Sequence, residues 1–128
     1  MGQDVYLSAL LFRLFTKADK KIIIDIGCNH PINYSNSYFF EKHFLCEVLA
    51  FDPISEYNEL WTTYRPSAKF YPYALDEEEG ELILNVPTKN NSEIDDMFSS
   101  ISKNNTHLKN FETDERKIKA VPLKKVLK

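Results

Sequence analysis

Two carboxylates in this sequence, Asp25 and Asp52, stand at the ends of apolar runs, and each is soon followed by a turn-forming residue, Gly27 or Pro53. Glycine allows the backbone to turn sharply and to approach a ligand without an intervening Cβ. A carboxylate can accept hydrogen bonds from both hydroxyls of a ribose, and charge-assisted bonds of this kind are stronger than neutral ones. The pattern therefore predicts a nucleoside site in which Asp52 binds the ribose. The alternatives are a helix cap for Asp52 and an ordinary strand-to-loop exit at Gly27.

The turn after Asp25 also restricts the kind of nucleoside. A dinucleotide fingerprint needs further glycines two and five residues after the first. Asn29 and Ile32 occupy those positions after Gly27. A pyrophosphate cradle is therefore not expected. The sequence favours a nucleoside without phosphates, of which S-adenosylmethionine is the common example.

The elements that must position these carboxylates alternate between strands and helices. Residues 22–26 form an apolar run with three consecutive isoleucines, which predicts a strand buried on both faces, as in a parallel sheet. The pattern continues with a helix over 37–45, a strand over 46–51, a helix over 55–64 and a strand over 69–75. Right-handed crossovers place the carboxyl ends of the first two strands side by side. Asp25 and Asp52 should therefore face one crevice.

The pattern changes after residue 75. An acidic turn over 76–80 leads to a strand over 81–86 with no helix between, which predicts an antiparallel hairpin with the preceding strand. Residues 87–116 are polar and are predicted to form a mobile loop, and a last strand follows over 117–123. Residues 1–20 are predicted to form an N-terminal helix and a short link. The whole chain, 1–128, is interpreted as a single domain truncated at its C-terminal end.

Composition excludes several classes of protein. The 128 residues carry a formal net charge of −3, which argues against a general nucleic-acid binder. The apolar stretch near the N-terminus is too short for a membrane span, which needs about 20 residues. No secretory signal precedes it. We therefore expect a cytoplasmic protein, with no membrane partner, whose Cys28 and Cys46 are free thiols.

Cysteine and histidine spacing raises the alternative of a zinc site. Cys28 and His30 form one pair, and His43 and Cys46 form another. Structural zinc usually has two to four residues between the first two ligands, and the first pair has one. The sequence therefore predicts no metal site. His30, followed by Pro31, is interpreted as a residue that shapes the loop.

One family resemblance covers nearly the whole chain from Lys21 onward. The segments that carry it are Asp25-Ile26-Gly27-Cys28-Asn29-His30-Pro31, Ser35-Asn36-Ser37-Tyr38-Phe39-Phe40, Phe51-Asp52-Pro53, Tyr73-Ala74-Leu75 and Gly80-Glu81-Leu82-Ile83-Leu84. Ser99-Ser100 and Val121-Pro122-Leu123 add weaker matches. Together they resemble the FkbM family of S-adenosylmethionine-dependent methyltransferases. Cys28 replaces the alanine that is usual in the first motif.

The resemblance implies an incomplete Rossmann-like, class I methyltransferase α/β fold, made of its first strands and helices with an added β-hairpin. It implies S-adenosylmethionine as cofactor and O-methylation of a hydroxyl on a sugar, glycan or other small metabolite. The residues that it assigns to cofactor binding are Asp25, Gly27, Cys28, Asn29, His30, Asp52, Ala74, Leu75 and Asp76. Asp52 would hold the ribose, and residues 74–76 would lie near the adenine. No catalytic residue is assigned.

The chain departs from the family after residue 123. Family members continue with a strand that carries an Asp-x-Glu-Gly motif, and this sequence has no such segment. Without that neighbour, the strand over 22–26 is expected at an edge of its sheet. We therefore expect the cofactor-binding half of an enzyme, or a chain whose sheet is completed by a second chain or a homo-oligomer. The alternative is a non-catalytic Rossmann-like binding or interaction module.

Overall fold

The computed structural model describes residue 6, residues 21–88, residues 99 and 101, and residues 112–128. Its elements are β1 (Ile22–Ile26), α2 (Asn36–Phe44), β2 (Glu47–Phe51), α3 (Tyr57–Tyr64), β3 (Lys69–Tyr71), β4 (Ala74–Leu75), β5 (Gly80–Pro87), β6 (Thr113–Val121) and α5 (Leu123–Val126). The helix and link predicted over 1–20 lie outside the described residues, apart from Tyr6. Most of the loop predicted over 87–116 does too. Its two ends were predicted wrongly, because residue 87 belongs to β5 and residues 113–116 belong to β6.

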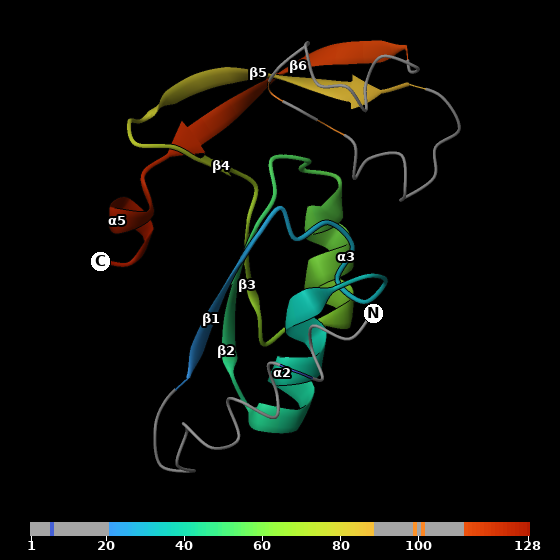
Figure 1. Ribbon diagram of the computed structural model, residues 1–128, viewed down its shortest axis with the longest axis vertical. Coiled ribbons are helices and arrows are strands. Elements are labelled where there is room, and N and C mark those ends of the chain that lie inside the picture. The colour runs from blue at the N-terminus through green and yellow to red at the C-terminus, as the bar shows by residue number, and fades with distance from the viewer. Residues whose placement is uncertain (1–5, 7–20, 89–98, 100, 102–111) are drawn as a thin grey trace.

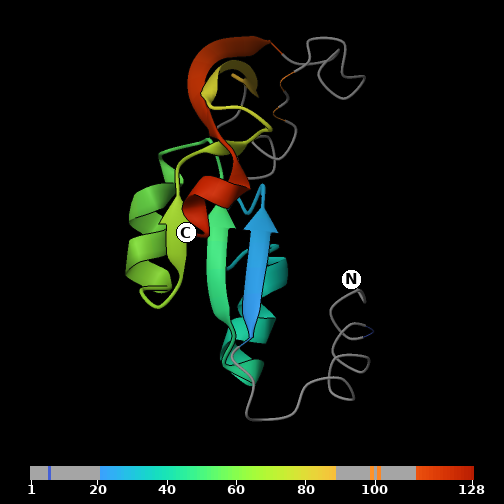
Figure 2. The same ribbon diagram turned by 90° about the vertical axis from the view of Figure 1, so that its left-hand side faces the viewer.

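The first sheet has the order β1-β2-β3 with all strands parallel. Helices α2 and α3 cover one of its faces, as Figures 1 and 2 show from two directions. Val48 and Ala50 of β2 are completely buried beneath the helices, in a cluster that includes Trp61. The indole of Trp61 stacks on the ring of Phe70, with 5.7 Å between the ring centroids. The predicted α/β class is confirmed.

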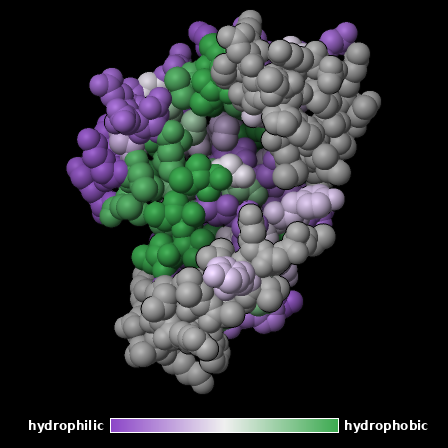
Figure 3. All heavy atoms as spheres, viewed as in Figure 1, coloured by the Kyte–Doolittle hydropathy of each residue, from purple (hydrophilic) through white to green (hydrophobic). Residues whose placement is uncertain are grey.

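Strand β1 differs from the prediction that both of its faces are buried. Ile22, Ile24 and Ile26 expose 52%, 37% and 64% of their surface, whereas Ile23 packs against the core on the helix side. Figure 3 shows hydrophobic side chains gathered on this side of the molecule. Among the described residues β1 pairs only with β2, so it lies at the sheet edge. The apolar run reflects a strand with one covered face, because α2 and α3 both pack on the same side.

Local capping explains where α2 begins and ends. The hydroxyl of Ser35 accepts a hydrogen bond from the backbone N–H of Tyr38 (3.2 Å), which satisfies one of the free donors of the first turn. Leu45 adopts the left-handed conformation, with φ of 53°, and so ends the helix one residue earlier than predicted.

Helix α3 starts at Tyr57, two residues later than predicted. Apolar residues at intervals of three and four are expected on the buried face of a helix. Tyr57 and Trp61 follow that expectation, but Tyr64 is 58% exposed. Tyr64 ends the helix, where the chain turns back toward β3.

The predicted strand over 69–75 is divided by Pro72 between two sheets. Proline has no backbone N–H to donate, and Tyr73 N instead bonds to Tyr71 O (2.8 Å). β3 therefore ends at Tyr71 in the first sheet, and β4 begins at Ala74 in a second sheet with the order β4-β6-β5. The prediction that the strands before and after residues 76–80 pair with each other was wrong. β5 pairs in antiparallel fashion with β6, and β4 also pairs with β6, in parallel.

The second sheet lies beyond the carboxyl ends of the first, and α5 lies on the side of the first sheet opposite α2 and α3 (Figures 1 and 2). Lys125 of α5 forms an ion pair with Glu79, in the turn before β5. No helix within the described parts of the chain has the length and apolar character to cross a membrane.

Candidate functional site

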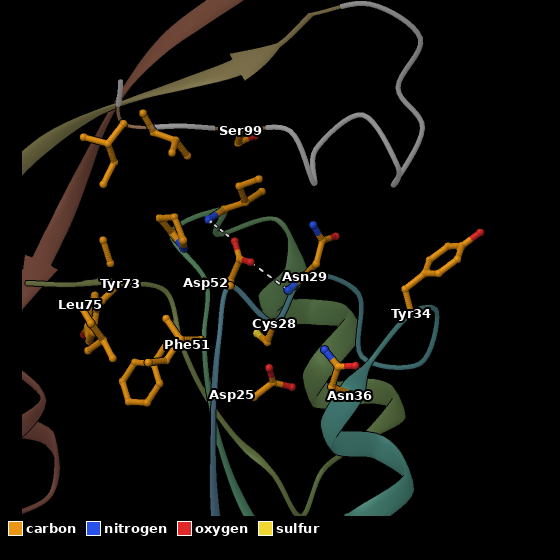
Figure 4. A pocket seen from close by; sticks show the side chains of 17 residues that line it. Asp25, Cys28, Asn29, Tyr34, Asn36, Phe51, Asp52, Tyr73, Leu75 and Ser99 are labelled. Carbon is orange, nitrogen blue, oxygen red and sulfur yellow. Dashed lines mark hydrogen bonds between the residues drawn. The ribbon is translucent and has the colours of Figure 1, made fainter. Parts of the chain in front are cut away.

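A cleft of about 640 Å³ lies where the carboxyl ends of β1 and β2 meet the second sheet. This is the edge of a parallel sheet where open α/β folds bind ligands. The described residues that line it are Asp25, Ile26, Gly27, Cys28, Asn29, Tyr34, Asn36, Phe51, Asp52, Pro53, Ile54, Tyr73, Ala74, Leu75, Leu84, Ser99 and Ile101. Figure 4 shows side chains from the strand ends and from the second sheet directed toward this space.

The turn after β1 gives the cleft its shape. Gly27 has a φ of 67°, a conformation that costs an L side chain about 1–2 kcal/mol. The N–H groups of Gly27 and Cys28 both donate to Phe51 O, at 2.8 and 3.2 Å, so the turn is fixed to the end of β2. Asn29 is also left-handed, with φ of 53°. The chain thereby turns across the top of β2 instead of continuing as a strand.

Asp52 holds this turn through its carboxylate. Oδ2 accepts from Asn29 N, and Oδ1 accepts from Ile54 N, both at 2.9 Å. The residue is only 4% exposed. The helix-cap alternative for Asp52 is wrong, because α3 begins only at Tyr57 and the bond to Ile54 N forms a turn ahead of it. Asp52 thus ties the turn after β1 to the segment after β2, and it also lines the cleft.

Helix α3 supports the same loop from behind through two side chains one turn apart. The indole N–H of Trp61 donates to Asn29 O (2.7 Å). Nη1 of Arg65 donates to Pro31 O (3.1 Å) and to the Ser35 hydroxyl (3.0 Å). Arg65 is 2% exposed, its Nε forms an ion pair with Glu41 (2.5 Å), and its guanidinium lies 4.4 Å from the Trp61 ring. The loop is therefore held from both sides, by Asp52 and by α3.

Asp25 is the other carboxylate of the cleft. Its Oδ2 atom is buried, and no described residue forms a hydrogen bond to it. Figure 4 places this carboxylate below Cys28 and beside Asn36. Buried polar atoms are nearly always hydrogen-bonded, because leaving one unpaired costs about 1–3 kcal/mol, and more when it is charged. A donor group of a ligand in the cleft would satisfy Asp25.

The described lining contains two carboxylates, Asp25 and Asp52, and no Lys, Arg or His. The charge of the described lining therefore favours a cationic or neutral ligand over an anionic one. Cys28 lies between the two acids. Burial raises the pKa of its thiol far above the usual range, and the charges of Asp52 and Asp25 raise it further.

The raised pKa predicts that Cys28 resists thiol reagents in the folded chain. In a Cys46→Ser variant at pH 8, labelling of Cys28 by a disulfide reagent should be on the order of 10-fold or more slower than in urea, because only the thiolate reacts. Its folded-state rate should stay below the rate in urea throughout pH 7 to 9 and should still be rising steeply at pH 9, where the rate of an ordinary thiol with a pKa of about 8.5 begins to level off. Because the folded pKa is above the unfolded one, the free energy of unfolding should fall as pH rises through about 8.5. Rapid labelling of the folded variant would contradict this account.

The sequence-predicted site residues divide into two groups. Asp25, Gly27, Cys28, Asn29, Asp52, Ala74 and Leu75 line the cleft, and His30 and Asp76 do not. Nδ1 of His30 accepts from the backbone N–H groups of Ile32 (3.1 Å) and Asn33 (3.0 Å), so the imidazole shapes the loop. Asp76 is exposed, and its carboxylate accepts from Glu77 N.

Several lining residues were not predicted as site residues. Phe51 and Tyr73 immediately precede predicted site residues, so their positions at strand ends were a usable signal. Phe51 stacks on Tyr71, with 4.9 Å between centroids, and gives the cleft an aromatic wall. Leu84, Ser99 and Ile101 belong to the second sheet and the segment that follows it. Nothing in the sequence indicates that this sheet folds over the strand ends.

Within the described ranges, no group of three or more His, Cys, Asp or Glu residues is placed to hold a metal ion. Both cysteines are free and buried, as their interpretation as thiols requires. No family model, curated protein or solved structure matches the chain.

Proposed function

We propose that this chain binds S-adenosylmethionine in the cleft and is a methyltransferase, or its cofactor-binding half, acting on a hydroxyl of a sugar or small metabolite. The observation that carries the proposal is the buried, unpartnered Oδ2 of Asp25 in a cleft whose described lining has two carboxylates and no cationic residue. S-adenosylmethionine combines a sulfonium and an ammonium with one carboxylate, so it is a net cation. Its charge complements that of the cleft.

The residues of the cleft fit the parts of this cofactor. Asp25 would accept from the ammonium group, and the carboxylate of Asp52 would accept from the ribose hydroxyls in addition to its backbone bonds. Tyr73, Ala74 and Leu75 would contact the adenine with apolar surface. When bound, the sulfonium supplies an activated methyl group, and the task of the chain is to align the acceptor with it and to exclude water. We also propose that the fold of this chain is an incomplete Rossmann-like fold.

Calorimetric titration of the whole chain with S-adenosylmethionine tests the proposal. We expect saturable binding that Asp25→Asn weakens about 10- to 100-fold, since a hydrogen bond to a charged group contributes about 1.5–3 kcal/mol. Asp76→Asn is the matched control, because it removes a carboxylate from outside the cleft, and it should change affinity less than about 2-fold. Adenosine monophosphate, an anion, should bind at least 10-fold more weakly. No binding of S-adenosylmethionine by the unmodified chain would overturn the proposal.

A second candidate function is a Rossmann-like binding module without turnover. It is favoured because the described lining leaves no separate base for the acceptor hydroxyl once Asp25 is assigned to the ammonium group. The Cys28 thiol stays protonated, Asp52 is engaged with the backbone, and Nδ1 of His30 accepts two backbone bonds outside the cleft. Binding of S-adenosylmethionine with no methyl loss in the presence of hydroxyl acceptors would favour this module over the enzyme.

A further inference from the structure

Ser99 has an unsatisfied hydroxyl in the wall of the cleft that faces the strand ends. Its Oγ is buried, and no described residue forms a hydrogen bond to it. Figure 4 shows Ser99 beneath the second sheet, across the cleft from Asp52 and Asp25. Its neighbours on the lining, Leu84 and Ile101, are apolar. Two opposite walls of one cleft therefore each carry a buried polar atom without a partner.

The two atoms differ in the ligand group that they would bind. The Asp25 carboxylate can only accept, so it selects a donor, whereas a serine hydroxyl both donates and accepts. A ligand hydroxyl can therefore either donate a hydrogen bond to the Ser99 hydroxyl or accept one from it. Leaving Oγ unpaired when the cleft is filled would cost about 1–3 kcal/mol. The wall around Ser99 therefore favours a ligand that presents a hydroxyl to it.

Charge limits this ligand further. Phosphates and carboxylates are usually bound by Lys, Arg or helix N-termini. The described lining offers no Lys or Arg, and the carboxylates of Asp25 and Asp52 line the same cleft as Ser99, with Asp52 nearer to it in Figure 4. An anionic group placed there would be repelled by both acids. A neutral molecule with several hydroxyls meets no such penalty.

We propose that Ser99 positions the methyl acceptor and that this acceptor is a neutral polyhydroxyl compound such as an unphosphorylated sugar. This inference rests on the proposed function, because it assigns the strand-end wall to the cofactor and the Ser99 wall to the acceptor. Beyond the proposed function, the inference names the substrate class, which excludes sugar phosphates and uronic acids. It also names Ser99 as a residue that recognises the substrate.

The test uses the whole chain saturated with S-adenosylhomocysteine, which occupies the cofactor site without reacting. Methyl α-glucopyranoside is then titrated, with glucose 6-phosphate and glucuronate as anionic counterparts. We expect saturable binding of the neutral glucoside and at least 10-fold weaker binding of both anions. Failure of the neutral glucoside to bind, or tighter binding of either anion, would overturn the proposed acceptor class.

Variants of Ser99 separate recognition from folding. Ser99→Ala should weaken glucoside binding about 3- to 10-fold, the effect of one lost hydrogen bond between neutral groups. Ser99→Thr should retain most of the affinity because it keeps the hydroxyl. Ser55→Ala, which removes an exposed serine hydroxyl outside the cleft, should have no effect.

The affinity for S-adenosylhomocysteine shows which of the two proposals fails. It should be the same in all of these variants and in the unmodified chain. Unchanged glucoside binding by Ser99→Ala would contradict the role of Ser99 and leave cofactor binding intact. Absence of S-adenosylhomocysteine binding would contradict the proposed function, and the glucoside titration of Ser99→Ala would still decide whether Ser99 binds a sugar.

Discussion

Replacement of Arg65 by alanine should lower the free energy of unfolding by about 3–5 kcal/mol, the cost of removing one partner from a buried ion pair. The guanidinium is buried, and its hydrogen bonds join Glu41 and Ser37 of α2 to the Pro31 carbonyl and the cap residue Ser35. Without it, the Glu41 carboxylate loses its cation, and its side chain is only 13% exposed. Since small domains have a total stability of about 5–15 kcal/mol, the loss is large. Equilibrium unfolding in urea measures it.

Arg116→Ala is the matched control for this prediction. Arg116 also pairs with a glutamate, Glu56, but the two side chains are 41% and 63% exposed. Exposed pairs contribute about 0–1 kcal/mol. Arg65→Lys keeps the charge and loses the branched hydrogen bonding, so its stability should fall between those of the alanine variant and the unmodified chain. A loss below about 1 kcal/mol for Arg65→Ala would show that the cation is not needed to join α2 to α3.

Replacement of Asp52 by alanine should cost about 3 kcal/mol or more of stability, because two hydrogen bonds to a charged group contribute about 1.5–3 kcal/mol each. The variant leaves the N–H groups of Asn29 and Ile54 without their acceptor, so the turn after β1 loses its support. Asp52 also raises the pKa of the neighbouring Cys28 thiol. Labelling of Cys28 should therefore become faster in the folded variant. Urea unfolding measures the loss of stability, and the labelling rate measures the effect on the thiol.

Asp52→Asn separates the shape of the side chain from its charge. Asparagine keeps one oxygen acceptor but directs an NH₂ group at the second backbone N–H. Asp52→Asn should therefore retain about half of the stability that Asp52→Ala loses. Asparagine removes the charge as alanine does, so Cys28 labelling should again be faster than in the unmodified chain. Full stability in Asp52→Ala would contradict this prediction, because it would mean that the turn stands without the carboxylate.

Much of the first sheet could be predicted from the sequence because its signals are local. The isoleucine run, the Ser35 cap and the Asp52-Pro53 turn each determine structure within a few residues. They placed Asp25 and Asp52 at one sheet edge correctly. The same local view was wrong about β1, because an apolar run does not indicate whether one layer of helices covers a strand or two.

The second sheet could not be predicted for the opposite reason. Its central strand, β6, pairs with β5 across a long separation in the chain, and the sequence around residue 80 equally suits a hairpin with the strand before it. Pro72 was the available signal that this strand must break, since its missing N–H cannot join a ladder. The positions of Leu84 and Ser99 in the cleft follow from this long-range pairing, and so no motif revealed them.

The edge of β1 that faces away from β2, unpaired among the described residues, sets a kinetic limit on this chain. The backbone of Lys21 and Gly27 bonds to β2, so by the alternation of a parallel ladder the backbone groups of Ile22, Ile24 and Ile26 point outward. An unpaired strand with apolar side chains is a template for pairing between molecules. Refolding is first order in chain, whereas such pairing is second order. Dilution therefore favours return to the native state after heating, and concentration favours aggregates.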